Sequence, residues 1–99
     1  MIGMMVKLEV KPNSGAAFES AFVAQAAAVR ANERGNFLYE LFRSRTRSDS
    51  YLLVEIYEDE AALAAHRDSP HMVAHRPLTA PFVAADPEIE AFDVVPHAA

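Results

Sequence analysis

The chain has 99 residues and a mass of 10.9 kDa, enough for one domain with one hydrophobic core. Hydrophobic residues make up 52% of it and charged residues 23%, which is typical of a folded globular protein rather than a disordered one. A net charge of −5 argues against nucleic acid as a partner, because binding to a phosphate backbone requires a basic surface. Without cysteine the chain has no disulfide, no thiolate nucleophile and no cysteine zinc site.

The apolar residues are distributed along the chain rather than gathered in one run. A transmembrane helix needs about 20 apolar residues in succession, and the sequence contains no such segment. The first ten residues, MIGMMVKLEV, have neither the basic leader nor the small-residue cleavage site of a secretory signal. We therefore expect a cytoplasmic protein that does not insert into membranes, with one domain over residues 1–95 and a short tail at 96–99.

The first two elements are predicted from the spacing of the apolar residues, which changes from every second residue to the spacing of a helix. Residues 2–10 alternate and predict a strand. The Ala-rich residues 16–31 carry apolar side chains at helical spacing and predict a long helix. Asn13 or Ser14 is its expected N-cap, and Gly35 its expected left-handed stop.

A hairpin is predicted next. Residues 37–46 and 51–58 each alternate with period two, and the polar residues 47–50 between them are typical of a turn. Both faces of the second of these strands are apolar. One face would present Leu52, Val54 and Ile56, and the other Tyr51, Leu53 and Tyr57.

The last third predicts two short helices and a closing strand. Asp59 is the expected N-cap of a helix that ends near residue 67, and Ser69 followed by Pro70 is a typical start of another. Pro77 and Pro81 are expected to limit that second helix. Residues 88–95 alternate again and predict the fourth strand.

The predicted order β-α-β-β-α(α)-β is that of a ferredoxin-like split βαβ sandwich: a four-stranded antiparallel sheet with its helices on one face, in the α+β class. The other face is apolar as well, and a solvated face would alternate to polar residues. Covering it would contribute several kcal/mol at about 25 cal/mol per Å². We therefore expect a homodimer in which two sheets pack face to face.

Three of the four histidines, His66, His71 and His75, lie within ten residues. Histidine titrates near neutral pH and is a common proton carrier. His66 follows the apolar position Leu63 and is expected to point inward. The spacing of His71 and His75 also suits a metal, but no third ligand accompanies them, and a simpler interpretation is that they cap or line a partly exposed helix. His97 lies in the tail and is expected to be solvated.

Glu55 shares its strand face with Leu53 and Tyr57, so an ionisable group lies in an apolar row. Burial would raise its pKa toward that of a useful general base. Alternatively, Glu55 forms a salt bridge with Arg43 or Arg45 at a dimer interface, and this alternative is slightly favoured. Arg43, Arg45 and Arg47 form a stripe that could steer an anion, although a solvated hairpin tip explains it more simply.

Three stretches carry a resemblance to a known family. They are GNFLYEL at 35–41, YLLVEIYEDEAALAAH at 51–66 and SPHM at 69–72. They resemble the antibiotic biosynthesis monooxygenase (ABM) family, with its glutamate-x-aromatic-glutamate strand end, short helix ending in histidine and serine-proline-histidine step. The resemblance implies a dimeric α+β barrel with a cavity in each subunit between sheet and helices. The family also includes haem-degrading enzymes and an isomerase of a phosphorylated signal molecule.

The resemblance implies a quinol monooxygenase-like enzyme without a cofactor or metal, acting on a small phenol, quinol or anthrone. Candidate catalytic residues are His66, His75, Tyr57 and Glu55. Candidate substrate-binding residues are His71, Tyr39, Asn36, Met72 and Phe22. Two alternatives remain: an isomerase of a phosphorylated ketose-like compound, and a non-enzymatic dimeric module that binds an apolar ligand.

Overall fold

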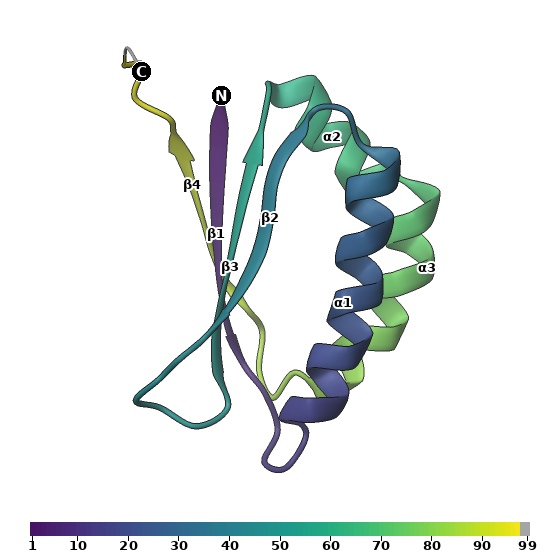
Figure 1. Ribbon diagram of the computed structural model, residues 1–99, viewed down its shortest axis with the longest axis vertical. Helices are drawn as coiled ribbons and strands as arrows, with labels where there is room; N and C mark the ends of the chain where they lie inside the picture. The colour runs from purple at the N-terminus through teal and green to yellow at the C-terminus, as the bar shows by residue number, and fades with distance from the viewer. Residues whose placement is uncertain (98–99) are drawn as a thin grey trace.

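The computed structural model describes residues 1–97 and shows a four-stranded antiparallel sheet whose helices all lie on one side (Figure 1). The elements in chain order are β1 (Ile2–Glu9), α1 (Gly15–Asn32), β2 (Asn36–Arg43), β3 (Ser50–Tyr57), α2 (Glu60–Asp68), α3 (Pro70–Thr79), the 3₁₀ turn η1 (Ala80–Phe82) and β4 (Glu88–Asp93). The strand order across the sheet is β2-β3-β1-β4. The predicted ferredoxin-like α+β fold is confirmed. Residues 98–99 of the predicted tail lie outside the described residues.

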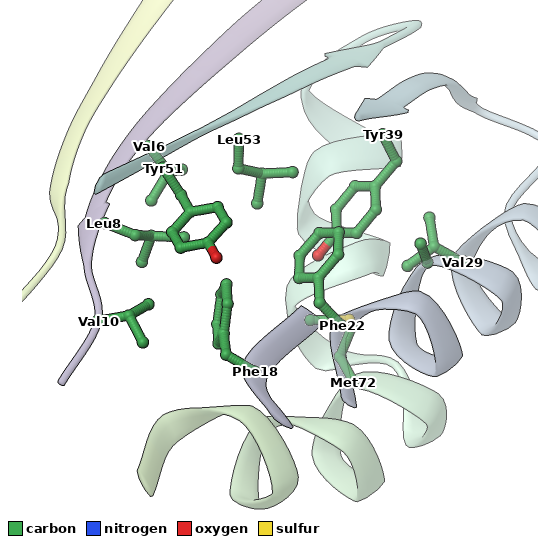
Figure 2. Close-up of a cluster of buried hydrophobic side chains, with 11 residues drawn as sticks. Val6, Leu8, Val10, Phe18, Phe22, Val29, Tyr39, Tyr51, Leu53 and Met72 are labelled. Atoms are coloured by element: carbon green, nitrogen blue, oxygen red, sulfur yellow. The ribbon is translucent and has the colours of Figure 1, made fainter. Parts of the chain in front are cut away.

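The face of the sheet that the helices cover carries the core. Alternate residues of β1 and β3 are buried there, with exposed fractions of 8% or less: Met4, Val6 and Leu8, and Tyr51, Leu53, Glu55 and Tyr57. Figure 2 shows several of these side chains directed at Phe18 and Phe22 of α1. The period-two pattern thus positions one row per strand beneath the helices, as predicted.

Helix α1 packs against the sheet through the apolar side chains along one side of the helix. Phe18 is 1% exposed and Val29 is completely buried. The ring of Phe22 stacks on that of Tyr39, with centroids 5.5 Å apart. Burying each large apolar side chain of this kind contributes about 1.5–3 kcal/mol, so the helix–sheet contact is the main source of stability.

The helix starts predicted in the last third are confirmed. Asp59 accepts a hydrogen bond from the main-chain N–H of Ala62 at 2.8 Å. Ser69 accepts one from Met72 N–H at 3.2 Å, with Pro70 as the first residue of α3. These two caps fix where α2 and α3 begin, and so fix the direction of the histidines that they carry.

The prediction that Gly35 ends α1 in a left-handed conformation is wrong, because no glycine of the chain has a positive φ. The helix ends at Asn32, and its C-cap residue, Glu33, is extended, with φ −122° and ψ 98°. Gly35 is needed for a close approach instead, since a Cβ there would lie 2.6 Å from Cβ of Ala62. Ser14 occupies the N-cap position of α1, but its side chain makes no capping hydrogen bond.

Two expected element limits also differ. Pro77 lies inside α3, which continues to Thr79 and then into η1. Proline has no N–H, so the carbonyl of Val73, four residues earlier, loses its hydrogen bond within the helix. Val73 is 62% exposed, so this carbonyl can bond to water instead. Strand β2 ends at Arg43, and its pairing with β3 is irregular at Phe37, which is 53% exposed.

The second face of the sheet is uncovered in the single chain. Leu52, Val54 and Ile56 of β3 point there and are half-buried. Exposed apolar side chains of the neighbouring strands surround them: Met5, Phe42 and Phe92. Among the described residues, no helix is both long and apolar enough to span a bilayer.

Candidate active site

A buried carboxylate joins two of the predicted histidines. Nδ1 of His66, on α2, lies 3.0 and 2.9 Å from the two carboxylate oxygens of Glu33, the C-cap residue of α1. Nε2 of His71, on α3, makes a hydrogen bond to Oε2 of the same carboxylate. The side chains of Glu33, His66 and His71 are 9%, 7% and 14% exposed. The site therefore draws on all three helices.

The other side of His66 faces a buried acid pair on β3. The hydroxyl of Tyr57 donates a hydrogen bond of 2.5 Å to Oε1 of Glu55, and Nε2 of His66 lies 3.7 Å from the same oxygen. Burial raises the pKa of Glu55, while the hydrogen bond from Tyr57 and the nearby His66 oppose that rise. His66 thus lies between two carboxylates.

The favoured alternative for Glu55, a salt bridge with Arg43 or Arg45 at a dimer interface, is wrong. Glu55 points to the helix side of the sheet, where its partners are Tyr57 and His66. Arg43 instead pairs with Glu19 at 2.9 Å, and Arg47 lies 3.4 Å from Glu9. The period-two pattern of β3 positions Glu55 inside together with its tyrosine neighbour.

Tyr39 of β2 packs beside the same imidazole. Its ring centroid is 5.6 Å from that of His66, and the centroid of Tyr57 is 5.2 Å away. The hydroxyl of Tyr39 accepts a hydrogen bond of 2.9 Å from Nε2 of Gln25, whose Oε1 accepts one from Thr79. Burial raises the pKa of both tyrosines, so each keeps its proton at neutral pH and can donate it in a hydrogen bond.

Two cavities lie near the site: the outer one is lined by Glu33 and His71, and the inner one reaches the cluster through Gln25. The inner cavity, about 480 Å³, lies between the sheet and α1, α3 and η1, with Val6, Phe22 and Leu53 among its apolar walls and Gln25 and Thr79 among its polar ones. The outer cavity, about 660 Å³, lies where the α1–β2 connection meets α2 and the start of α3. Among the residues that line it are Glu33, Asn36, Ala62, Ser69 and His71.

The structure brings five of the nine candidate site residues together: His66, His71, Glu55, Tyr57 and Tyr39. The other four lie elsewhere. The amide of Asn36 donates to the carbonyl of Leu38, next to the outer cavity. Phe22 lines the inner cavity, and Met72 is part of the core. Among the described residues, Nδ1 of His75 is buried without a hydrogen-bond partner.

Three polar residues of the site were not foreseen: Glu33, Ser69 as a side-chain partner, and Gln25. Glu33 is 33 and 38 positions away from its two histidines, so no local spacing indicates the contact. Gln25 lies on the buried face of α1. Its polar side chain in an apolar stripe was the available signal.

The cluster is arranged so that it can transfer a proton. Its carboxylates and imidazoles are hydrogen-bonded to one another, and residues 1–97 contain no group of three or more such side chains placed to hold a metal ion. A carboxylate beside an imidazole stabilises the positive charge that the imidazole acquires when it takes a proton. Chemically, this arrangement can accept a proton from a bound molecule.

Comparisons with known proteins agree with the fold. The model of the antibiotic biosynthesis monooxygenase family matches residues 1–78. A solved structure from Caulobacter crescentus CB15, named a "putative antibiotic biosynthesis monooxygenase", is 37% identical, with a TM-score of 0.92 over 96% of this chain and 90% of its own.

Two more distant structures share the fold. One, of the same name, is from Nitrosomonas europaea and is 23% identical, with a TM-score of 0.86 over 96% of this chain and 99% of its own. Rv0793 from Mycobacterium tuberculosis is 21% identical, with a TM-score of 0.84 over 99% and 98%. No curated protein matches the chain. With the family model covering residues 1–78, this chain belongs to the antibiotic biosynthesis monooxygenase family.

Proposed function

We propose that this protein is a cofactor-independent monooxygenase that oxidises a small phenol, quinol or anthrone with O₂. The observation that carries the proposal is the burial of His66 between the carboxylates of Glu33 and Glu55. Its ring packs beside Tyr39, whose hydroxyl is bonded to Gln25 in the wall of a mainly apolar cavity. Family membership supports the reaction class. The cavity, with apolar walls and a few polar groups, suits a flat aromatic ring.

Tyr39 connects the inner cavity with His66. Its hydroxyl is bonded to Gln25 in the cavity wall, and its ring packs on the imidazole. The bond from Gln25 occupies an acceptor position of the Tyr39 oxygen and leaves the hydroxyl hydrogen able to donate. In the proposal this hydrogen binds the oxygen of a substrate and stabilises the negative charge that develops on it.

The chemistry needs only a base and a dry site, because the substrate supplies the electrons. His66 removes a phenolic or benzylic proton, and the resulting anion passes an electron to O₂. The two radicals combine, the O–O bond breaks, and one oxygen atom leaves as water. For an anthrone, the methylene carbon loses two hydrogens and gains one oxygen, which balances the consumption of one O₂. Glu33 and Glu55 stabilise the imidazolium formed in the first step.

Oxygen uptake tests the proposal directly. Metal-stripped protein is incubated with a panel of hydroquinones, naphthols and anthrones, and O₂ is followed with an electrode. We expect uptake above the buffer rate for at least one member, with one O₂ consumed per product formed. No uptake above buffer across the panel contradicts the proposal. Turnover that is independent of O₂ would instead indicate proton-transfer chemistry alone, as in an isomerase.

We further propose that the working form is a homodimer whose two uncovered sheet faces pack together. The support is the row Leu52, Val54 and Ile56, which is only half-buried in one chain and is continued by the exposed Met5 and Phe92. Monomeric proteins rarely leave such a contiguous apolar face in water. Light scattering should give twice the chain mass of 10.9 kDa, and a stable 10.9 kDa species contradicts this proposal.

A further inference from the structure

Ser69 determines which nitrogen of His71 carries a hydrogen. The hydroxyl of Ser69 has one hydrogen, which it donates to the main-chain oxygen of His66 at 2.9 Å. Its oxygen also accepts a hydrogen bond from Met72 N–H. The remaining contact, 3.1 Å to Nε2 of His71, can then only be one in which Ser69 accepts. Nε2 of His71 is therefore an N–H, and it points at both Ser69 and Glu33.

The same assignment of donors and acceptors can be made for His66. A carboxylate only accepts hydrogen bonds, so Glu33 accepts from Nε2–H of His71 and requires a donor at Nδ1 of His66. Both carboxylate oxygens lie within 3.0 Å of that nitrogen. In a neutral imidazole with its hydrogen on Nδ1, the lone pair is on Nε2. That nitrogen faces Glu55 at 3.7 Å.

We propose that Glu33 is a positioning residue that holds His66 as its Nδ1–H tautomer, so that Nε2 is the nitrogen that takes the proton. The groups that face this imidazole from the packed elements are Glu33, Glu55, Tyr39 and Tyr57. Among them only Glu33 contacts Nδ1. The role of Nε2 as a base rests on the proposed function, whereas the tautomer itself does not.

Substitution of Glu33 by glutamine should reverse the tautomer. A glutamine amide presents one acceptor and one donor, and both positions lie within 3.0 Å of Nδ1 of His66. With its oxygen at the Oε2 position the amide still accepts from His71. Its NH₂ group then lies at the Oε1 position and faces Nδ1 of His66 at a distance where two hydrogens would collide, so we expect Nδ1 to become the acceptor. Every hydrogen bond is satisfied once the hydrogen of His66 moves to Nε2.

Nitrogen-15 NMR of the histidine side chains measures this in the protein without substrate. The pH is raised until the histidine signals no longer change, and the wild-type His66 signals should then show a hydrogen on Nδ1 and none on Nε2. Glu33→Gln should exchange the two patterns. Glu58→Gln, which removes an exposed carboxylate just beyond β3, should leave His66 as in the wild type. The His66→Gln spectrum assigns the signals.

A wild-type His66 that is protonated on Nε2, alone or on both nitrogens, overturns the proposal. So does a Glu33→Gln variant that retains the Nδ1–H tautomer. The wild-type spectrum decides the tautomer even if the variant does not fold. With a substrate in hand, Glu33→Gln should lower kcat by about 100-fold or more with little change in KM, because Nε2 then carries a hydrogen. If the wild type consumes no O₂, the proposed function fails while the tautomer assignment is still decided by NMR.

Discussion

Strand β3 presents two different surfaces at alternate positions. On the helix side, Tyr51, Leu53, Glu55 and Tyr57 are each 7% exposed or less. On the other side, Leu52, Val54 and Ile56 are half-buried and no element of the same chain covers them. The first face has a carboxylate and a phenol inside it, and the second presents three apolar side chains in a row. The comparison indicates that the first face carries the chemistry and that the second one carries association.

The largest difference between the two faces should appear in subunit stability. Phe18→Ala removes a ring that is 1% exposed beneath the sheet, and such truncations cost about 3–5 kcal/mol. Phe42→Ala removes a ring that is 54% exposed on the other face, and its cost within one subunit should stay below about 1 kcal/mol. Urea unfolding followed by circular dichroism at low protein concentration measures both. Equal losses of unfolding free energy for the two variants would show that the two faces do not differ in their contribution to the stability of one subunit.

The uncovered face is tested by a charge at its centre. Val54 pairs with Met5 of β1 and Glu40 of β2, so Val54→Glu introduces a carboxylate into the middle of the proposed interface. A buried unpaired charge should weaken association by about 3 kcal/mol, more than 100-fold. Light scattering should show dissociation while circular dichroism stays unchanged. Val54→Thr, of similar shape, is the matched control, and a dimer that survives Val54→Glu would place the interface elsewhere.

On the helix side, the sharpest packing constraint is at Gly35. The methyl group of Gly35→Ala would meet Cβ of Ala62 at 2.6 Å, so the connection after Glu33 must move away from α2. We expect a loss of about 1–3 kcal/mol, as is typical of overpacking. Ala62→Gly in the same chain should recover part of this loss. Absence of any rescue would show that the cost comes from another source than this contact.

The smallest expected effect concerns the pH dependence of stability. Burial raises the pKa of Glu55 in the folded state above its ordinary value of 4.5. The folded chain therefore binds the proton more tightly, and stability decreases as the pH rises from the unfolded-state pKa through the folded-state pKa. Glu55→Gln should flatten this decrease. Urea midpoints across the acidic range measure it, and an unchanged slope would mean that Glu55 is not the group responsible.

The fold was predictable because its patterns are local. The alternation in residues 51–58 and the Ser69-Pro70 helix start each depend on neighbours in sequence, and both are confirmed. The end of α1 was less predictable. Gly35 lies in the turn after α1 as expected, but without a positive φ, and a close contact with Ala62 on another helix is what requires a glycine there. Of the two prolines expected to limit α3, Pro77 lies inside the helix, whereas the helix ends at Thr79, two residues before Pro81.

The site was predictable in its parts but not in its connections. His66 was expected to point inward because it follows Leu63 on an amphipathic helix, and it does. Glu55 lies in an apolar row as expected, but its partner is His66 rather than an arginine, because the packing of α2 against β3 brings His66 near it. Glu33 was missed altogether. Its two partners lie on helices more than 30 residues later in the chain, and no repeating pattern in the sequence indicates a contact over that separation.

The most direct test of the central claim compares two histidines in the oxygen-uptake assay, with the substrate that the wild type oxidises fastest. His66 is enclosed between Glu33 and Glu55, whereas His97 is exposed near the end of the chain. We predict that His66→Gln lowers kcat by about 100-fold or more, as expected for the loss of a general base, and that His97→Gln leaves kcat unchanged. A folded His66→Gln protein with the wild-type rate would contradict the account.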